Sequence, residues 1–142
     1  MDNIVFEDHS VQVLNVIKET AIAWLHEASG EIITQTTRNY DSAGRVDTGK
    51  TKGSFTHHVD DGELKSSIGS PDENAIWEEY GTGIYAENGN GRKTSWVYKD
   101  PKTGNFYTTR GKKGHRPFQH AYDSKQSTII RMAEKKFGNN LK

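Results

Sequence analysis

The chain has 142 residues, a length that fits one domain able to bury about two-thirds of its unfolded surface on folding. It contains no cysteine, which excludes disulfides and thiolate zinc sites, and no stretch resembles a membrane span or a signal peptide, so we expect a soluble, non-secreted protein. Its 19 Lys and Arg residues balance its 19 Asp and Glu residues, whereas a dedicated DNA-binding domain usually carries a clear positive excess.

The first predicted element is a long amphipathic helix from residue 10 to about residue 36. Ser10 is a suitable N-cap, and Gly30 is a weak point near the end of the helix. Apolar residues recur along it at spacings of three and four, as expected for one buried face. These residues are Leu14, Ile17, Ala21, Trp24, Leu25, Ala28 and Ile32. The polar segment 38–44 then predicts a loop.

A hairpin and a short helix are predicted next. Residues 55–60 and 64–69 have the composition of two strands, with Asp61-Gly62 as a tight turn between them. Residues 71–80 then predict a short helix that Gly81 ends.

A second hairpin follows at residues 95–99 and 105–110. Aromatic side chains lie on both of its arms, and the intervening Asp-Pro-Lys-Thr-Gly supplies the turn. The flanking segments 87–93 and 111–114 are flexible by composition. The hairpin and its flanks therefore form a flexible basic hairpin insertion over residues 88–116.

Pro117 opens the last predicted helix, residues 117–137, with Gly138 as its C′ residue. Helices at both ends with hairpins between them predict the α+β class. We expect one domain over residues 1–142, with both long amphipathic helices packed on one side of an antiparallel sheet built from hairpins. The residues expected in or near the core are Trp24, Leu25, Trp77, Phe118 and Tyr122.

The balanced net charge hides a strong asymmetry. Residues 60–87 contain eight acidic residues and one lysine, whereas residues 88–116 contain eight Lys and Arg residues and one aspartate. Two interpretations are open: the two segments pair within one subunit, or they form complementary surfaces for head-to-tail assembly.

Three short motifs follow one another along the chain. Each is a signal of backbone geometry, because glycine permits positive φ at a sharp turn and proline suits the first turn of a helix. The motifs are Val46-Asp47-Thr48-Gly49, Glu78-Glu79-Tyr80-Gly81-Thr82-Gly83 and Arg116-Pro117-Phe118. In this order, with Gly53-Ser54-Phe55 after the first and a long helix before them all, they resemble the head–tail joining proteins of long-tailed bacteriophages, the neck and tail-completion family. The resemblance covers residues 10 to 137, and the Gly- and Lys-rich segment 84–115 departs from it most.

The resemblance implies a structural protein and not an enzyme, with no cofactor and no metal. It implies a ring, a hexamer in the virion, that contacts neighbouring head-closure and tail-tube or terminator proteins and touches no membrane. Such a protein is found in the host cytoplasm during assembly and then in the virion neck or tail, where the second hairpin has the opportunity for transient contact with DNA in the channel. The motif residues with a structural role are Asp47, Thr48, Gly49, Tyr80, Gly81, Thr82, Gly83, Pro117 and Phe118. The charged residues expected at the ring interface are Glu78, Glu79, Arg110, Lys112, Lys113 and Arg116.

The residues leave two alternatives from other classes. Residues 44–51 match the phosphate-binding loop letter for letter, but that loop must follow a buried strand and open a helix, and here polar residues precede it and a strand is predicted after it. The second hairpin combines aromatic side chains with Lys and Arg, which is the composition of a single-stranded nucleic-acid surface; a nucleic-acid-binding accessory protein using residues 92–116 is therefore the main alternative.

The histidines and acidic pair do not indicate a catalytic site. His57 and His58 are adjacent on a predicted strand, so their side chains point to opposite faces and cannot chelate one metal together. Glu78 and Glu79 precede a glycine turn, where acidic residues are usually exposed.

Overall fold

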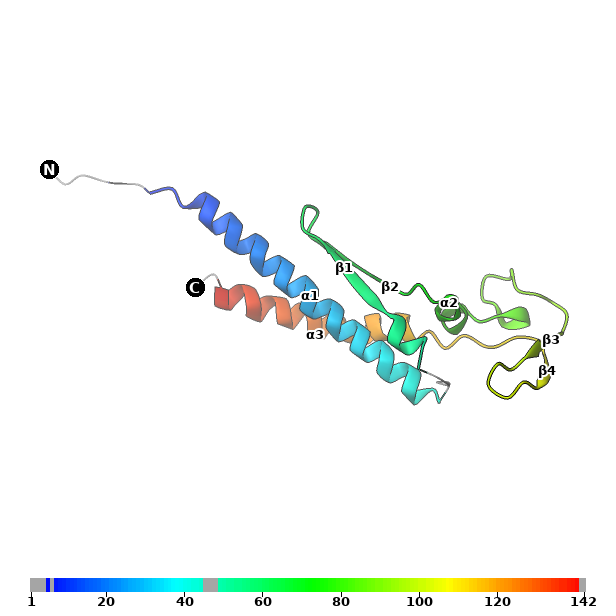
Figure 1. The fold of residues 1–142 in the computed structure, drawn as a ribbon. Helices are drawn as coiled ribbons and strands as arrows, with labels where there is room; N and C mark the ends of the chain where they lie inside the picture. Colours follow the sequence, from blue (N-terminus) through cyan, green and yellow to red (C-terminus); the bar gives the residue numbers. More distant parts are fainter. Residues whose placement is uncertain (1–4, 6, 45–48, 141–142) are drawn as a thin grey trace.

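The computed structural model describes residues 5, 7–44 and 49–140, and the protein it shows is elongated (Figure 1). Two long helices, α1 (Ser10–Ser42) and α3 (Pro117–Asn140), lie side by side along the long axis. The hairpin of β1 (Thr56–Asp60) and β2 (Lys65–Gly69) runs along α1. The remaining elements lie towards the end opposite the N-terminus: α2 (Glu73–Tyr80), the 3₁₀ turn η2 (Gly83–Tyr85), β3 (Trp96–Lys99) and β4 (Phe106–Thr109).

The predicted α+β class is confirmed, with two long terminal helices and two antiparallel hairpins. Among the described residues the hairpins form two separate two-stranded sheets. In the first, Thr56 pairs with Gly69 and Asp60 with Lys65, and the turn between them spans four residues instead of the predicted two. The Asp60 carboxylate closes this turn by accepting hydrogen bonds from the N–H groups of Gly62 and Glu63. In the second, β3 and β4 contact mainly each other.

Helix α1 is longer than predicted. It continues through Gly30 and through the predicted loop to Ser42. The extra part of the helix, after Thr36, carries Tyr40, which is 2% exposed. Burial of this face against the rest of the molecule outweighs the weak helix propensity of the polar residues around it. The helix start is also capped differently: the Asp8 carboxylate accepts the Ser10 N–H at 2.9 Å, so Ser10 receives a cap instead of providing one.

Helix α3 begins at Pro117 as predicted but continues past Gly138, so Gly138 lies inside the helix and is not its C′ residue. In contrast, the predicted end of α2 is confirmed. Gly81 has φ 82° and follows the last helical residue, Tyr80. The Asp72 carboxylate caps the start of α2 by accepting the Asn74 N–H at 3.0 Å.

A small core lies where α1 meets α3. Ala28 of α1 and Ala121 of α3 are buried, and such small side chains let two helices approach closely. The indole N–H of Trp24 donates to the Ile129 carbonyl oxygen at 2.7 Å, so a part-buried aromatic ring also joins the two helices. The Phe55 and Phe118 rings stack 5.8 Å apart with an interplanar angle of 8°.

Two of the five predicted core residues are exposed. Trp77 is 47% exposed and Tyr122 is 43% exposed, whereas Trp24, Leu25 and Phe118 are partly buried. Trp77 is exposed because α2 turns Ala75, Glu78 and Glu79 inward, which places the indole on the opposite side of this short helix.

Candidate functional site

The geometry of the second motif comes from a close crossing of two backbone segments, residues 81–84 and 110–114. The Thr82 N–H donates to the Lys112 carbonyl oxygen at 2.8 Å, and the Ile84 N–H donates to the Arg110 carbonyl oxygen at 3.0 Å. The Lys112 N–H in turn donates to the Thr82 hydroxyl oxygen at 2.9 Å. This crossing, which we name the glycine junction, ties the base of the second hairpin to the end of α2.

Glycine is required on both sides of the glycine junction. Gly81 and Gly83 have φ values of 82° and 59°, which confirms the predicted positive φ at both. A Cβ atom on Gly81 would lie 2.7 Å from the Tyr85 carbonyl oxygen and 2.8 Å from that of Lys112. On the other strand of the crossing, a Cβ on Gly114 would lie 2.5 Å from the Glu79 carbonyl oxygen, and one on Gly111 would collide with Thr82. Residues 111–114, predicted to be flexible from their composition, therefore pack closely here, and their glycines permit that packing.

Beneath the glycine junction lies a buried carboxylate. Glu78 is 1% exposed and forms an ion pair with the Lys112 ammonium group. Its second carboxylate oxygen lies 2.7 Å from His115 Nε2, and its backbone carbonyl oxygen accepts the His115 N–H at 2.8 Å. A buried carboxylate is tolerated only with such partners, so this network joins α2 to the segment that leads into α3.

Glu79, which is 9% exposed, caps a helix that begins 38 positions later in the sequence. Its carboxylate accepts the Phe118 N–H at 2.5 Å and lies 3.4 Å from the Gln119 nitrogen. These N–H groups belong to the first turn of α3, where they lack partners within the helix and the helix dipole favours negative charge. The prediction that Glu78 and Glu79 form an exposed ring interface is therefore wrong, because both side chains face inward.

A second charge pair closes the outer side of this region. Arg116 pairs with Glu87, and its guanidinium lies 5.2 Å from the centre of the Tyr80 ring. The hydrogen bond from Arg116 lowers the pKa of Glu87 below its ordinary value and raises the pKa of Arg116. Thus Glu78–Lys112 and Glu87–Arg116 both join the acidic segment to the basic segment within one chain. Of the basic residues expected at an interface, Arg110 and Lys113 are exposed.

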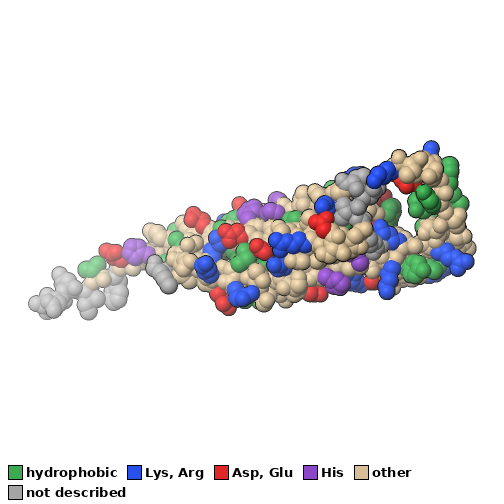
Figure 2. Space-filling model, turned by 90° about the horizontal axis from the view of Figure 1, so that it is seen from below, with side chains coloured by type: hydrophobic (Ala, Val, Ile, Leu, Met, Phe, Trp, Pro, Cys, Tyr) green, Lys and Arg blue, Asp and Glu red, His purple; other side chains and the backbone are tan. Residues whose placement is uncertain are grey.

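Large apolar side chains are exposed at the same end of the molecule, together with Lys and Arg (Figure 2). We call this set the aromatic end; it comprises Ile76, Trp77, Tyr80, Ile84, Tyr85, Val97, Tyr98, Phe106 and Tyr107, each between 42% and 69% exposed. A groove of about 410 Å³ lies within it, between the side chains of Trp77, Tyr80 and Trp96, with the glycine junction along one side. A contiguous apolar surface of this kind usually marks an interaction site.

Most of the first motif lies outside the described residues. Asp47 and Thr48 lie outside the described residues, and Gly49 has the predicted positive φ, 81°. Helix α1 precedes this motif in the chain, and the short 3₁₀ turn η1 (Lys52–Ser54) comes between the motif and β1. Where the chain is described, it therefore lacks the strand–loop–helix order that a phosphate-binding loop needs.

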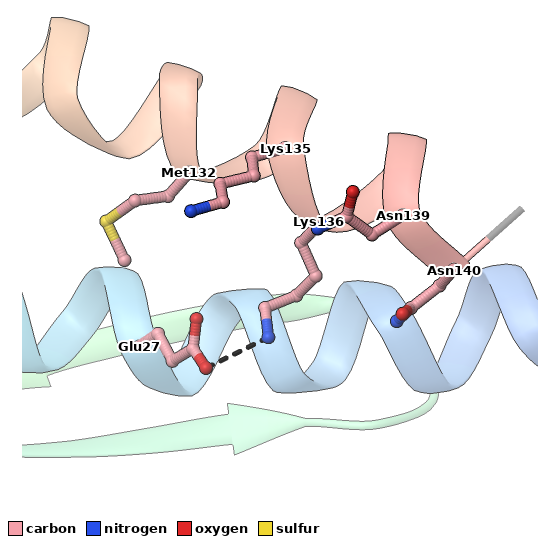
Figure 3. Close-up of a pocket in the computed structure, with 6 residues that line it drawn as sticks. All are labelled: Glu27, Met132, Lys135, Lys136, Asn139 and Asn140. Atoms are coloured by element: carbon pink, nitrogen blue, oxygen red, sulfur yellow. Dashed lines mark hydrogen bonds and ion pairs between the residues drawn. The ribbon is translucent and has the colours of Figure 1, made fainter. Parts of the chain in front are cut away.

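A separate groove between the long helices lies near the other end of the molecule (Figure 3). It has a volume of about 350 Å³ and is crossed by the Glu27–Lys136 ion pair at 2.9 Å. Its remaining lining residues, Met132, Lys135, Asn139 and Asn140, all come from α3. Long side chains that lie along a helix–helix seam explain this groove without a ligand.

Besides the contact of His115 with Glu78, sequence reasoning missed a contact between two histidines. His26 Nδ1 on α1 lies 2.9 Å from His57 Nε2 on β1, so these two rings share a hydrogen bond. Only the packing of the hairpin on α1 brings them together, and no sequence spacing indicates it. In the part of the chain that the structure describes, no group of three or more His, Cys, Asp or Glu side chains is arranged to hold a metal.

No family model, curated protein or solved structure matches this chain. None of the described helices is long and apolar enough to cross a membrane.

Proposed function

We propose that this protein is a structural component that joins the head and tail of a long-tailed bacteriophage, acting as one subunit of a ring. The observation that carries this proposal is the role of the motif residues on which the resemblance rests. Gly81 and Gly83 make the backbone crossing possible, and Pro117 begins a helix whose first turn is capped by Glu79. These are architectural roles, which suit a protein that acts by shape and assembly.

Fewer charged residues are left for a ring interface than the sequence predicted. The buried Glu78 pairs with Lys112 and the exposed Glu87 pairs with Arg116 within one subunit, so these side chains already have partners in their own chain. The exposed aromatic end, with Arg110 and Lys113 nearby, is the surface left for partner rings. We propose a hexameric ring in the virion, with the neighbouring head-closure and tail-tube or terminator proteins as its partners.

The test is genetic complementation combined with electron microscopy. A phage that carries a stop codon in this gene should produce filled heads and complete tails that remain separate, and supplying the protein from a plasmid should restore joined particles. Joined, infectious particles formed without the protein would overturn the proposal.

A second candidate function is single-stranded nucleic-acid binding by the second hairpin. The observation that favours it is the exposure of Tyr98, Phe106 and Tyr107 beside basic side chains, with Lys99 lying 5.9 Å from the centre of the Phe106 ring. Exposed rings of this kind can stack on bases while cations contact phosphates. Fluorescence anisotropy with labelled single-stranded DNA at low and high salt tests it, and no binding by the wild type at low salt would exclude it.

A further inference from the structure

The two ends of the elongated molecule both expose apolar side chains. At the N-terminal end, α1 extends beyond α3: Asn140, in the last turn of α3, reaches Thr20 with a hydrogen bond of 3.2 Å. Residues 10–19 of α1 therefore project past this contact, and we name them the α1 overhang. Val11, Val13 and Leu14 on the overhang are 65%, 48% and 63% exposed.

The α1 overhang continues the apolar stripe by which α1 packs on α3. Leu14 and Ile17 precede Ala21 and Trp24 at spacings of three and four, so they lie on the same face of the helix. A free helical segment of this length, about 15 Å, is only marginally stable in water by itself. Its apolar stripe is thus suited to a partner that covers it.

The aromatic end offers a groove of the corresponding kind. Ile76 and Trp77 line the groove and are 62% and 47% exposed. The hairpin beside it has two strands that contact mainly each other, and a two-stranded hairpin without a covering layer is marginally stable in water. An amphipathic helix laid in a hydrophobic groove is a recurrent recognition mode.

The charges of the two ends are opposite. Glu7 and Asp8 lie just before α1, and on the overhang Lys18 and Glu19 offset each other, so the described residues of this end carry a small acidic excess. Around the groove and the hairpin the exposed charged residues are mainly basic, among them Arg92, Lys93 and Lys99. Contact between two like ends would place charges of the same sign together, whereas contact between unlike ends places opposite charges together.

We propose that the α1 overhang of one copy of this protein docks in the groove of the aromatic end of the next copy. The resulting interface is heterologous, which is the type that generates a ring or a filament. The proposal rests on the proposed function for its biological meaning, since it gives that ring a specific interface. The contact itself is a property of the purified protein.

Disulfide cross-linking tests this contact directly, because the natural chain has no cysteine. Leu14→Cys and Ile76→Cys variants, each changed at an exposed position, are purified separately, mixed at high concentration and oxidised mildly. We expect several-fold more of the mixed Leu14→Cys/Ile76→Cys disulfide than of a control pair made from Leu14→Cys and Ser127→Cys, whose cysteine is exposed on α3. The yield should fall as salt is added, because exposed charge pairs are screened.

Two results would overturn the docking proposal. The first is a mixed Leu14→Cys/Ile76→Cys yield no greater than that of the Ser127→Cys control. The second is a dominant Leu14→Cys homodimer, which would indicate that like ends meet. Either result leaves the neck assignment open to its own complementation test, and joined particles formed without the protein, together with efficient cross-linking, would overturn the neck assignment alone.

Discussion

At the residue scale, the glycine junction makes the sharpest demand on side-chain size. Gly83→Ala should destabilise the fold by about 2 kcal/mol or more, because a residue with a Cβ is strained at positive φ and the added atom collides with Arg110. Urea unfolding followed by circular dichroism measures this change. Gly138→Ala is the matched control: it has open space and lies in a helix, so it should stabilise by about 0.5–1 kcal/mol. Equal stabilities for the two variants would contradict the crossing.

Because Glu78 is buried, reversing its charge should affect the stability of the subunit itself. Glu78→Lys would place a second ammonium group beside Lys112 in a buried position, so we expect loss of about 3–5 kcal/mol and unfolding at moderate temperature. The double variant Glu78→Lys/Lys112→Glu should recover part of this loss by restoring opposite charges. Thermal melts of the three proteins are the measurement, and a Glu78→Lys protein that melts with the wild type would show that the pair contributes little.

The pairing of Glu87 with Arg116 should make the free energy of unfolding depend on pH in the acid range. The hydrogen bond from Arg116 lowers the pKa of Glu87 below the ordinary value of 4.5 in the folded state. The pair therefore contributes its full stabilisation above the unfolded-state pKa, and this contribution is lost as the pH falls through the lower folded-state pKa. Unfolding curves of the wild type and of Glu87→Gln should differ at neutral pH and converge below that folded-state pKa. A constant difference across the acid range would contradict the assignment.

At the element scale, the first turn of α3 depends on a side chain from α2. Glu79→Ala removes the carboxylate that accepts the Phe118 N–H, and we expect a loss of about 0.5–2 kcal/mol, the range for helix capping groups. Hydrogen exchange should show reduced protection at Phe118 and Gln119. Glu134→Ala, an exposed change later in α3, serves as the control and should leave these amides protected as in the wild type.

Local signals in the sequence indicate where α2 forms but not which of its faces is buried. Its bounds follow from local signals, since Asp72 caps its start and Gly81 ends it. Its orientation does not, because Trp77 lies on one side of this eight-residue helix and Glu78 and Glu79 lie on another, and local signals alone do not choose between the two sides. Glu78 and Glu79 find their partners more than 30 positions away in the same chain, at Lys112, His115 and Phe118. These partners favour burial of the two glutamates.

At the scale of the whole molecule, the second hairpin is a separable unit. Trp96 and Thr109 are paired in register, so residues 97–108 can be replaced by Gly-Gly without pulling on the glycine junction. We expect the helical circular dichroism signal and the melting temperature to stay close to the wild type, because β3 and β4 contact mainly each other. Head–tail joining in the complementation assay should fall. A strong loss of helical signal would mean that the hairpin supports the long helices.

The sequence by itself determined where the helices and strands form. The apolar spacing of three and four, the alternating residues of the hairpins, and glycine or proline at element ends all act over a few neighbouring residues. The starts of α1 and α3, both hairpins and the end of α2 follow from such local signals, whereas α2 begins two positions after the predicted Pro71.

Only the tertiary structure decided how far α1 extends, which side of α2 is buried and why the glycines at 111 and 114 are needed. Each depends on contacts between segments distant in the chain: Tyr40 packs its ring against Phe55, Glu78 meets Lys112, and Thr82 meets Lys112 across 30 positions. Burial and close backbone approach are properties of the assembled fold. A sequence pattern therefore predicts that glycine permits a turn, and only the folded chain shows which atoms require its missing side chain.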